Sequence, residues 1–138
     1  MSQTKITVDA TISANTPKVW EYWTTPKHIT NWNFASDDWH CPNAENDLMV
    51  DGKLKSRMEA KDGSFGFDFE AIYDEIINHK KIVFTMTDGR RAITNFENQN
   101  GKTKVSTTFD AEKENPVEMQ RSGWQAILNN FKKYVESN

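Results

Sequence analysis

The sequence predicts an α+β domain in which an antiparallel sheet is covered by a long C-terminal helix. Three observations predict it: apolar residues alternate through most of the chain, turn signals separate the alternating segments, and helical spacing replaces the alternation near the C-terminus. That last helix has no helical neighbour in sequence, so its apolar stripe must pack on the sheet. We therefore expect a curved antiparallel sheet of about six or seven strands with helices on one face.

The N-terminal segment predicts one strand and two short helices. Residues 5–13 read as a half-buried strand because apolar side chains occupy every second position: Ile6, Val8, Ala10 and Ile12. Pro17 follows Thr16, which can cap a helix, and this pair predicts a short helix over residues 17–23. A second Thr-Pro pair predicts another short helix over residues 25–31.

A loop is expected over residues 32–46, because periodicity disappears there and Asp, Asn, Ser and Pro accumulate. It carries Trp32, Phe34 and Trp39. A meander of strands follows, separated by turn signals, at residues 53–59, 65–73, 82–86, 90–97 and 103–110. The second of these has the cleanest alternation in the chain, with one face formed by Phe65, Phe67, Phe69, Ala71 and Tyr73.

The C-terminal segment predicts an amphipathic helix of about 20 residues, roughly 30 Å long. Asn115 as the cap, Pro116 in the first position and Glu118 reaching back predict a capping box. One apolar stripe follows at helical spacing, formed by Trp124, Ile127, Leu128, Phe131 and Val135. Because a long helix need not close against a strongly curved sheet along its whole length, we expect a pocket between them.

Composition narrows the function classes. The net charge is −3, from 17 basic and 20 acidic residues with no basic stripe, which disfavours nucleic acid as a partner. Cys41 is the single cysteine, so neither an internal disulfide nor a zinc-finger spacing exists. No apolar stretch reaches the length of a membrane span and no leader is evident at the N-terminus, so we expect one cytoplasmic domain over residues 1–138, not bound to membranes.

Four blocks of sequence, in this order, resemble the SRPBCC (START/Bet v 1-like) superfamily, and within it the branch related to the C-terminal domain of the activator of Hsp90 ATPase. The blocks are VWEYWTTPKHITNWN (19–33), DDWHCPNAENDLMVDGKLKSRM (37–58), FEAIYDEI (69–76) and GWQAILNNF (123–131). The resemblance implies a helix-grip fold, in which the sheet wraps around the C-terminal helix and encloses a hydrophobic cavity. Fold membership alone does not fix an activity.

The rings on the predicted inward faces are the candidate ligand-binding residues, since ligand pockets are mostly apolar and aromatic with few polar groups. The full candidate set is Trp32, Trp39, Met58, Phe67, Phe69, Tyr73, Phe84, Met86, Phe96, Met119, Trp124 and Leu128. Tyr73 and Thr94 would supply polar contacts. The expected function is binding of a small hydrophobic or aromatic molecule, without cofactor or metal, by a monomer or homodimer.

Two alternatives stay open. One is a co-chaperone-like interaction with an Hsp90-type ATPase, which the resemblance implies. The other is a cyclase or hydrolase that uses the same cavity with His40, Asp37 or Asp38, because the loop over residues 36–41 gathers two carboxylates, an imidazole and a thiol. This spacing matches no metal motif, and we expect the loop to act as a lid with solvated acids. His28 and His79 are expected at the surface.

Overall fold

The computed structural model describes residues 4–138. Residues 1–3 belong to the N-terminal segment in which we expected no leader, and they lie outside the described part. Within residues 4–138, seven strands form one antiparallel sheet in the order β1-β7-β6-β5-β4-β3-β2. Their bounds are β1 Lys5–Ile12, β2 Trp39–Asn46, β3 Lys53–Ala60, β4 Gly66–Ile77, β5 Lys81–Met86, β6 Arg91–Gln99 and β7 Lys102–Asp110. The helices are α1 Thr16–Thr24, α2 Pro26–Ile29 and α3 Val117–Glu136. The predicted α+β class is confirmed.

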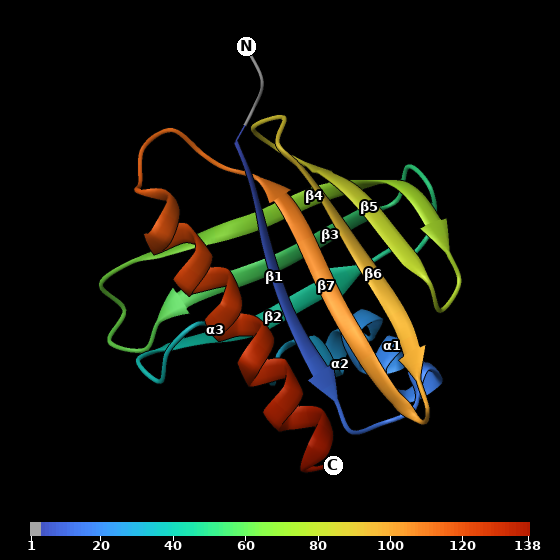
Figure 1. The fold of residues 1–138 in the computed structure, drawn as a ribbon. Helices are drawn as coiled ribbons and strands as arrows, with labels where there is room; N and C mark the ends of the chain where they lie inside the picture. The colour runs from blue at the N-terminus through green and yellow to red at the C-terminus, as the bar shows by residue number, and fades with distance from the viewer. Residues whose placement is uncertain (1–3) are drawn as a thin grey trace.

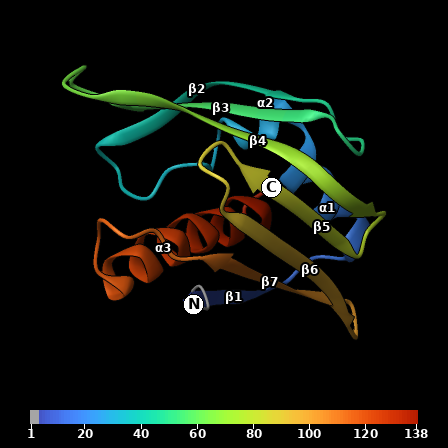
Figure 2. The same ribbon diagram turned by 90° about the horizontal axis from the view of Figure 1, so that it is seen from above.

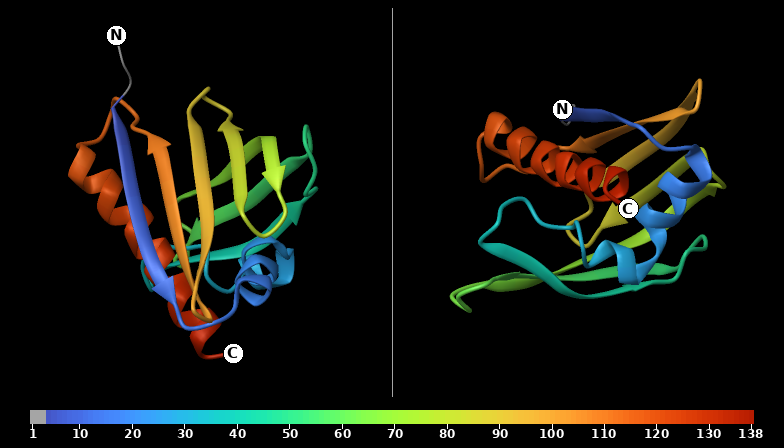
Figure 3. Two further views of the ribbon diagram at one scale, coloured as in Figure 1. Left: turned by 45° about the vertical axis from the view of Figure 1, so that its right-hand side comes forward. Right: turned by 90° about the horizontal axis from the view of Figure 1, so that it is seen from below.

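The sheet curls strongly, and its inward face wraps around α3. Seen from above, β2, β3 and β4 form one arm of a U, β1, β7 and β6 form the other, and α3 lies between them (Figures 1 and 2). Viewed from below, α3 runs beside β1, and its C-terminus approaches α1 (Figure 3). This is the helix-grip arrangement. No helix of the described chain is long and apolar enough to cross a membrane.

Residues 32–46 are not one loop, and this prediction is corrected. The segment Trp39–Asn46 is the edge strand β2, paired with β3. The register shifts between His40 and Asn43, and Pro42 lies inside the irregularity. A bulge interrupts the period-2 pattern, and proline is tolerated on an edge strand because its nitrogen needs no partner there. The alternation by which strands are recognised is therefore missing from this one.

Helix starts also differ from the prediction in detail. Asn15 rather than Thr16 caps α1, with its Oδ1 accepting from the Lys18 N–H at 3.0 Å. The Thr16 hydroxyl instead hydrogen-bonds the Thr103 hydroxyl, 3.1 Å away. Helix α2 is a single turn, shorter than expected.

The capping box predicted for α3 is wrong, and the buried Gln120 side chain bonds the loop before the helix instead. The N-cap is Pro116, which makes no side-chain capping bond, and Asn115 donates to Glu112 instead. The Gln120 amide accepts from the Glu112 N–H at 2.8 Å and donates to the Asn115 carbonyl at 2.7 Å. Through these bonds a residue in the first turns of α3 holds the loop that leads into it.

Candidate functional site

On the inward face of β4, the side chains near the N-terminal end of the strand are more exposed than those near its middle. The exposed fraction is 61% at Phe65, just before the strand, and 42% at Phe67. Phe69 is half-buried, while Ala71 and Tyr73 are 2% and 3% exposed. All five side chains share one face, since alternate residues of a strand point the same way. Large apolar groups on this face are thus open to solvent at one end and buried at the other.

Helix α3 shows the same gradient. Met119 in its first turn is 61% exposed, Trp124 and Ile127 are half-buried, and Phe131 is completely buried. Both α3 and β4 begin on the same side of the molecule in Figures 1 and 2. We call the exposed and half-buried apolar side chains there, Trp39, Phe65, Phe67 and Met119, the open end.

One side of α3 is fastened to β1. The Gln125 amide donates to the Asp9 carbonyl at 2.9 Å, and the Lys132 ammonium donates to the Thr11 carbonyl at 2.7 Å. The helical spacing puts Gly123 on another flank, together with Met119 and Ile127. A methyl group added at Gly123 would meet nothing within 4 Å, although this glycine is itself only partly exposed. Free space therefore adjoins α3 on the flank away from β1.

The opposite end of the inward face is packed with rings. We call this cluster the closed end: Trp20, Trp23, Trp32, Phe96 and Phe131. Trp32 stacks on Trp23 at 5.0 Å between centroids and meets Phe131 edge to face at 4.8 Å. The Trp32 indole N–H donates to the Tyr22 carbonyl at 3.0 Å, so its polar atom is paired as well. Aromatic pairs in such arrangements stabilise a fold beyond the area they bury.

The twelve residues predicted to line the cavity differ in burial. Seven are buried: Trp32 and Phe96 in the closed end, Leu128 on α3, and Met58, Tyr73, Phe84 and Met86 on the inward face of the sheet. Three are half-buried, namely Trp39, Phe69 and Trp124, and two are exposed, namely Phe67 and Met119. The Trp124 ring stacks on Phe109 with 3.8 Å between centroids, which fixes α3 to the sheet. Phe69 meets Phe84 edge to face at 5.9 Å, further along the same face.

The polar groups on the inward face are mostly paired. The Tyr73 hydroxyl donates to Asn46 Oδ1 at 2.6 Å, and Asn46 donates in turn to the Thr24 carbonyl at 2.6 Å. Burial raises the pKa of Tyr73 far above its usual value, so the phenol stays neutral. Thr94, predicted as a second polar contact, shares a hydrogen bond with Thr107 at 2.9 Å. Ser56 was not among the predicted polar contacts, and its buried hydroxyl has no partner among the described residues.

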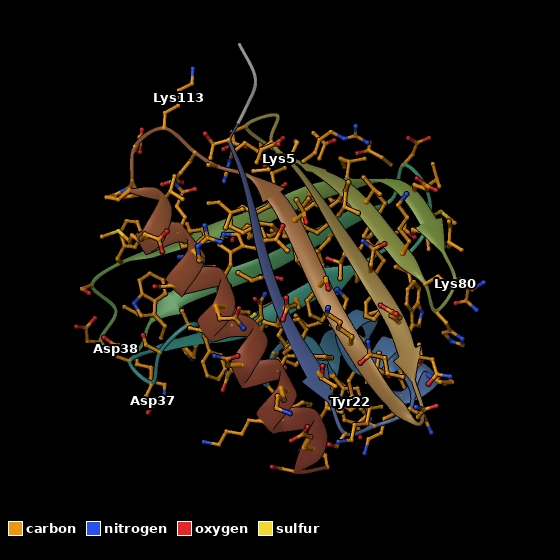
Figure 4. All side chains as sticks on the ribbon, in the orientation of Figure 1. Lys5, Tyr22, Asp37, Asp38, Lys80 and Lys113 are labelled. Atoms are coloured by element: carbon orange, nitrogen blue, oxygen red, sulfur yellow. The ribbon has the colours of Figure 1, made fainter. Side chains whose placement is uncertain are left out.

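Residues 36–41, expected to form a loop, run into β2, and the structure separates their reactive groups. Cys41 is buried on the inward side, whereas the half-exposed His40 ring lies 3.5 Å from the Glu59 carboxylate. Burial raises the pKa of the Cys41 thiol, and the thiol donates to the Asn43 carbonyl at 3.5 Å. Asp37 and Asp38 lie at the periphery (Figure 4). The thiol and imidazole therefore do not form a nucleophile–base pair, and no group of metal-ligating side chains exists in the described chain.

His28 is not at the surface, and that expectation is corrected. Its side chain is mostly buried, stacked on Tyr22 at 4.0 Å between centroids, with Nδ1 2.8 Å from the Tyr134 hydroxyl. Burial, aided by the nearby Lys27 charge, lowers the pKa of this imidazole. His28 thus links α2 to α3 as a structural group. The ring of His79, in the turn before β5, lies against Trp20.

Three surface pockets lie away from these inward faces. The first pocket, of about 280 Å³, lies between residues 34–37 and the outer side of α3 near Asn130 and Lys133. A second, of about 350 Å³, lies over the β2 bulge, and a third, of about 480 Å³, lies between the β5–β6 turn and residues 110–114. Charged side chains line the last two, among them Arg57, Glu59, Asp88 and Glu112. None of the three is lined by Phe69, Phe84 or Trp124.

The comparison with known proteins decides the family. The family model of the activator of Hsp90 ATPase homolog 1-like proteins (AHSA1) matches residues 13–136. The chain belongs to this AHSA1-like family. The family lies within the SRPBCC superfamily, so the predicted resemblance is confirmed and a cavity-forming fold is implied. No curated protein matches the AHSA1-like chain significantly.

Solved structures support the assignment. The AHSA1-like protein from Aeromonas hydrophila is 42% identical, with a TM-score of 0.91 over 97% of this chain and 93% of that one. A protein from Cytophaga hutchinsonii is 47% identical, with a TM-score of 0.84 over the same shares. A protein from Chromobacterium violaceum shares the fold with a TM-score of 0.87 at 20% identity, over 98% of this chain and 99% of that one.

Proposed function

We propose that this AHSA1-like domain binds a small, uncharged, apolar or aromatic molecule between α3 and the inward faces of β3 and β4. The observation that carries the proposal is the matched exposure gradient along β4 and α3. Soluble proteins seldom leave large apolar side chains exposed together unless they meet a partner or ligand. Here the exposed rings continue inward as one apolar face through Phe69 to Phe84.

The expected affinity follows from the apolar area available. Covering about 300 Å² of apolar surface at about 25 cal/mol per Å² is worth about 7 kcal/mol. Association and ordering subtract several kcal/mol from that figure. A Kd between about 0.1 and 1 mM is therefore expected for a two-ring hydrocarbon.

Methionine methyl groups provide a direct test, because they occupy different parts of the molecule. Met58 and Met86 face inward and Met119 lies at the open end, whereas Met49 is exposed in the β2–β3 loop, beyond the other end of β3. Titrating methyl-¹³C-methionine protein with 2-methylnaphthalene should shift the Met58, Met86 and Met119 signals and leave Met49 in place. Shifts confined to Met49, or no shifts up to the solubility of the probe, would contradict the proposal.

Two variants of β4 form a matched pair for the same titration. Phe69→Ala removes a half-buried ring from the inward face, whereas Ile72→Ala removes an exposed side chain from the outer face of the same strand. We expect Phe69→Ala to weaken 2-methylnaphthalene binding at least five-fold and Ile72→Ala to leave the Kd unchanged. Equal effects of the two substitutions would place the binding site elsewhere.

A protein partner is the second candidate, since exposed rings also suit a protein surface. The name of the family points to an Hsp90-type ATPase as that partner. Phe65→Ser and Phe67→Ser would then abolish any stimulation of the ATPase rate, and the inner Phe69→Ala change would not. No association and no change in ATPase rate with wild-type protein would eliminate this candidate.

A further inference from the structure

Ser56 is an unpaired polar group within an apolar part of the inward face. It lies at the middle of β3, opposite Phe69 on β4 and Ala44 on β2. Its exposed fraction is 0%, and its Oγ forms no hydrogen bond with any residue that the structure describes. Buried hydroxyl groups almost always have a partner, because leaving one unsatisfied costs free energy. The position therefore calls for an additional group.

The surroundings of Ser56 do not supply that group. The neighbouring inward residues along β3 are Leu54 and Met58, both apolar. Ser56 has a polar contact with the Cys41 thiol and lowers its pKa, but burial is the larger effect and raises that pKa, so the thiol stays neutral and donates its own proton to the Asn43 carbonyl. A neutral sulfur is a weak acceptor, so this contact does not satisfy the Ser56 hydroxyl, and its lone pairs remain free for another molecule.

The same surroundings define the chemistry of the molecule. Next to Ser56, the described inward-facing side chains of β3 and β4 carry no charge: Leu54, Met58, Phe67, Phe69 and Ala71. An ionised ligand group would lose its hydration there without a counter-charge, which is far more costly than burying a neutral oxygen. A ring system with one hydroxyl or carbonyl group would satisfy the serine and the apolar walls together.

We propose that Ser56 is the polar anchor of the site, and that the ligand is a neutral aromatic molecule whose single hydroxyl or carbonyl oxygen hydrogen-bonds the Ser56 hydroxyl. This inference rests on the proposed function, because it places the ligand against the same inward face. It adds a specific residue and a chemical class, which the exposure gradient alone does not provide.

Two probes of the same shape separate the anchor from the apolar walls. 2-Naphthol and 2-methylnaphthalene differ by a hydroxyl in place of a methyl group. In the methionine titration, Ser56→Ala should weaken 2-naphthol binding about five- to ten-fold, as expected for the loss of one hydrogen bond. The same variant should bind 2-methylnaphthalene as tightly as the wild type or more tightly. Ser106→Ala, the same change on the outer face of β7, should alter neither Kd.

Each result has a definite consequence. If neither naphthalene binds the wild type, the proposed function fails and the anchor fails with it. If both bind and Ser56→Ala leaves the ratio of the two Kd values unchanged, the anchor alone is overturned. Binding of ionised 2-naphthoate as tightly as 2-naphthol would overturn the neutral ligand class.

Thermal unfolding without ligand provides an independent readout. A serine that awaits a ligand is unsatisfied in the free protein, so Ser56→Ala should leave the Tm unchanged or raise it. A fall of 5 °C or more would mean that the hydroxyl already has a structural partner, which would overturn the anchor.

Discussion

Aromatic side chains gather at both ends of the inward face, and the two ends hold them differently. At the closed end, Trp32 and Phe131 are buried and lie within 5 Å of each other between centroids. At the open end, Trp39, Phe65 and Phe67 also contact one another, at 5.9 to 6.2 Å, yet the two phenylalanines remain exposed. Aromatic side chains thus stabilise the fold at the closed end, whereas at the open end they form an apolar surface that is exposed to solvent.

The largest difference should appear in stability. Phe131→Ala removes a completely buried ring from the closed end and should lower the free energy of unfolding by about 3–5 kcal/mol. Phe65→Ala at the open end should change it by no more than about 0.5 kcal/mol, because the ring is mostly exposed. Urea unfolding measures both. Losses of similar size would mean that the open end is packed after all.

The end of β7 is held to β1 and β6 by charge rather than by rings. Asp110 at the end of β7 accepts from the Lys5 ammonium and from the Arg91 N–H, and the Lys5 hydrogen bond is the main reason why the pKa of Asp110 falls below its ordinary 3.8. Asp110→Asn should cost about 1.5–3 kcal/mol at pH 7.

The sign of the acid dependence follows from that lowered pKa. The stabilisation is complete above pH 3.8 and is lost as the pH falls through the lower pKa of the folded protein. Urea unfolding at pH 7 and pH 3 should therefore show a smaller acid loss for Asp110→Asn than for the wild type. An identical acid loss in both proteins would show that Asp110 does not contribute.

Tyr73 joins the inward face to α1 through Asn46, and its removal should have a moderate effect. Tyr73→Phe leaves the Asn46 oxygen without its donor and should cost about 1–2 kcal/mol. Because burial raises the pKa of Tyr73 above its ordinary 10.0, wild-type stability should fall as the pH rises past 10, when only the unfolded phenol ionises readily. Unfolding at pH 9 and pH 11 should show a smaller alkaline loss in the variant, and an equal loss would contradict this account.

The smallest expected effect tests the free space beside α3. Gly123→Ala adds a methyl group that meets nothing within 4 Å and should stabilise the helix by about 0.5–1 kcal/mol. Gly63→Ala serves as the control, since that glycine has φ +77° in the β3–β4 turn and the change should destabilise. A loss of stability in Gly123→Ala would mean that the flank is already filled.

Regular alternation made most of the fold predictable. The alternation from Phe65 to Tyr73 predicts which side chains face inward, because one face is apolar and the strand has no bulge before Tyr73. The sequence pattern does not predict the edge strand β2, because Pro42 and the bulge break the alternation. The long helix was predicted from its stripe, but its start was not, since Gln120 satisfies the loop through tertiary bonds that no local motif encodes.

The sequence predicts which residues of the candidate site face inward, but it does not predict how exposed each of them is. Alternation places Phe67, Phe69 and Ser56 on the inward face, but exposure depends on how closely α3 and the sheet approach each other. That approach is set by long-range contacts such as Trp124 on Phe109. His28 shows the same limit, because its burial requires Tyr134, more than a hundred residues away.

The bulge in β2 bears on the tendency of the protein to aggregate. An unpaired strand edge invites a strand from another molecule, and a protein with solvent-facing rings next to such an edge would be prone to aggregate. Pro42 lacks a backbone donor, and the register shift beside it bends the edge away from a straight ladder. The irregular edge strand thus discourages strand addition at the side of the molecule where Trp39 is partly uncovered.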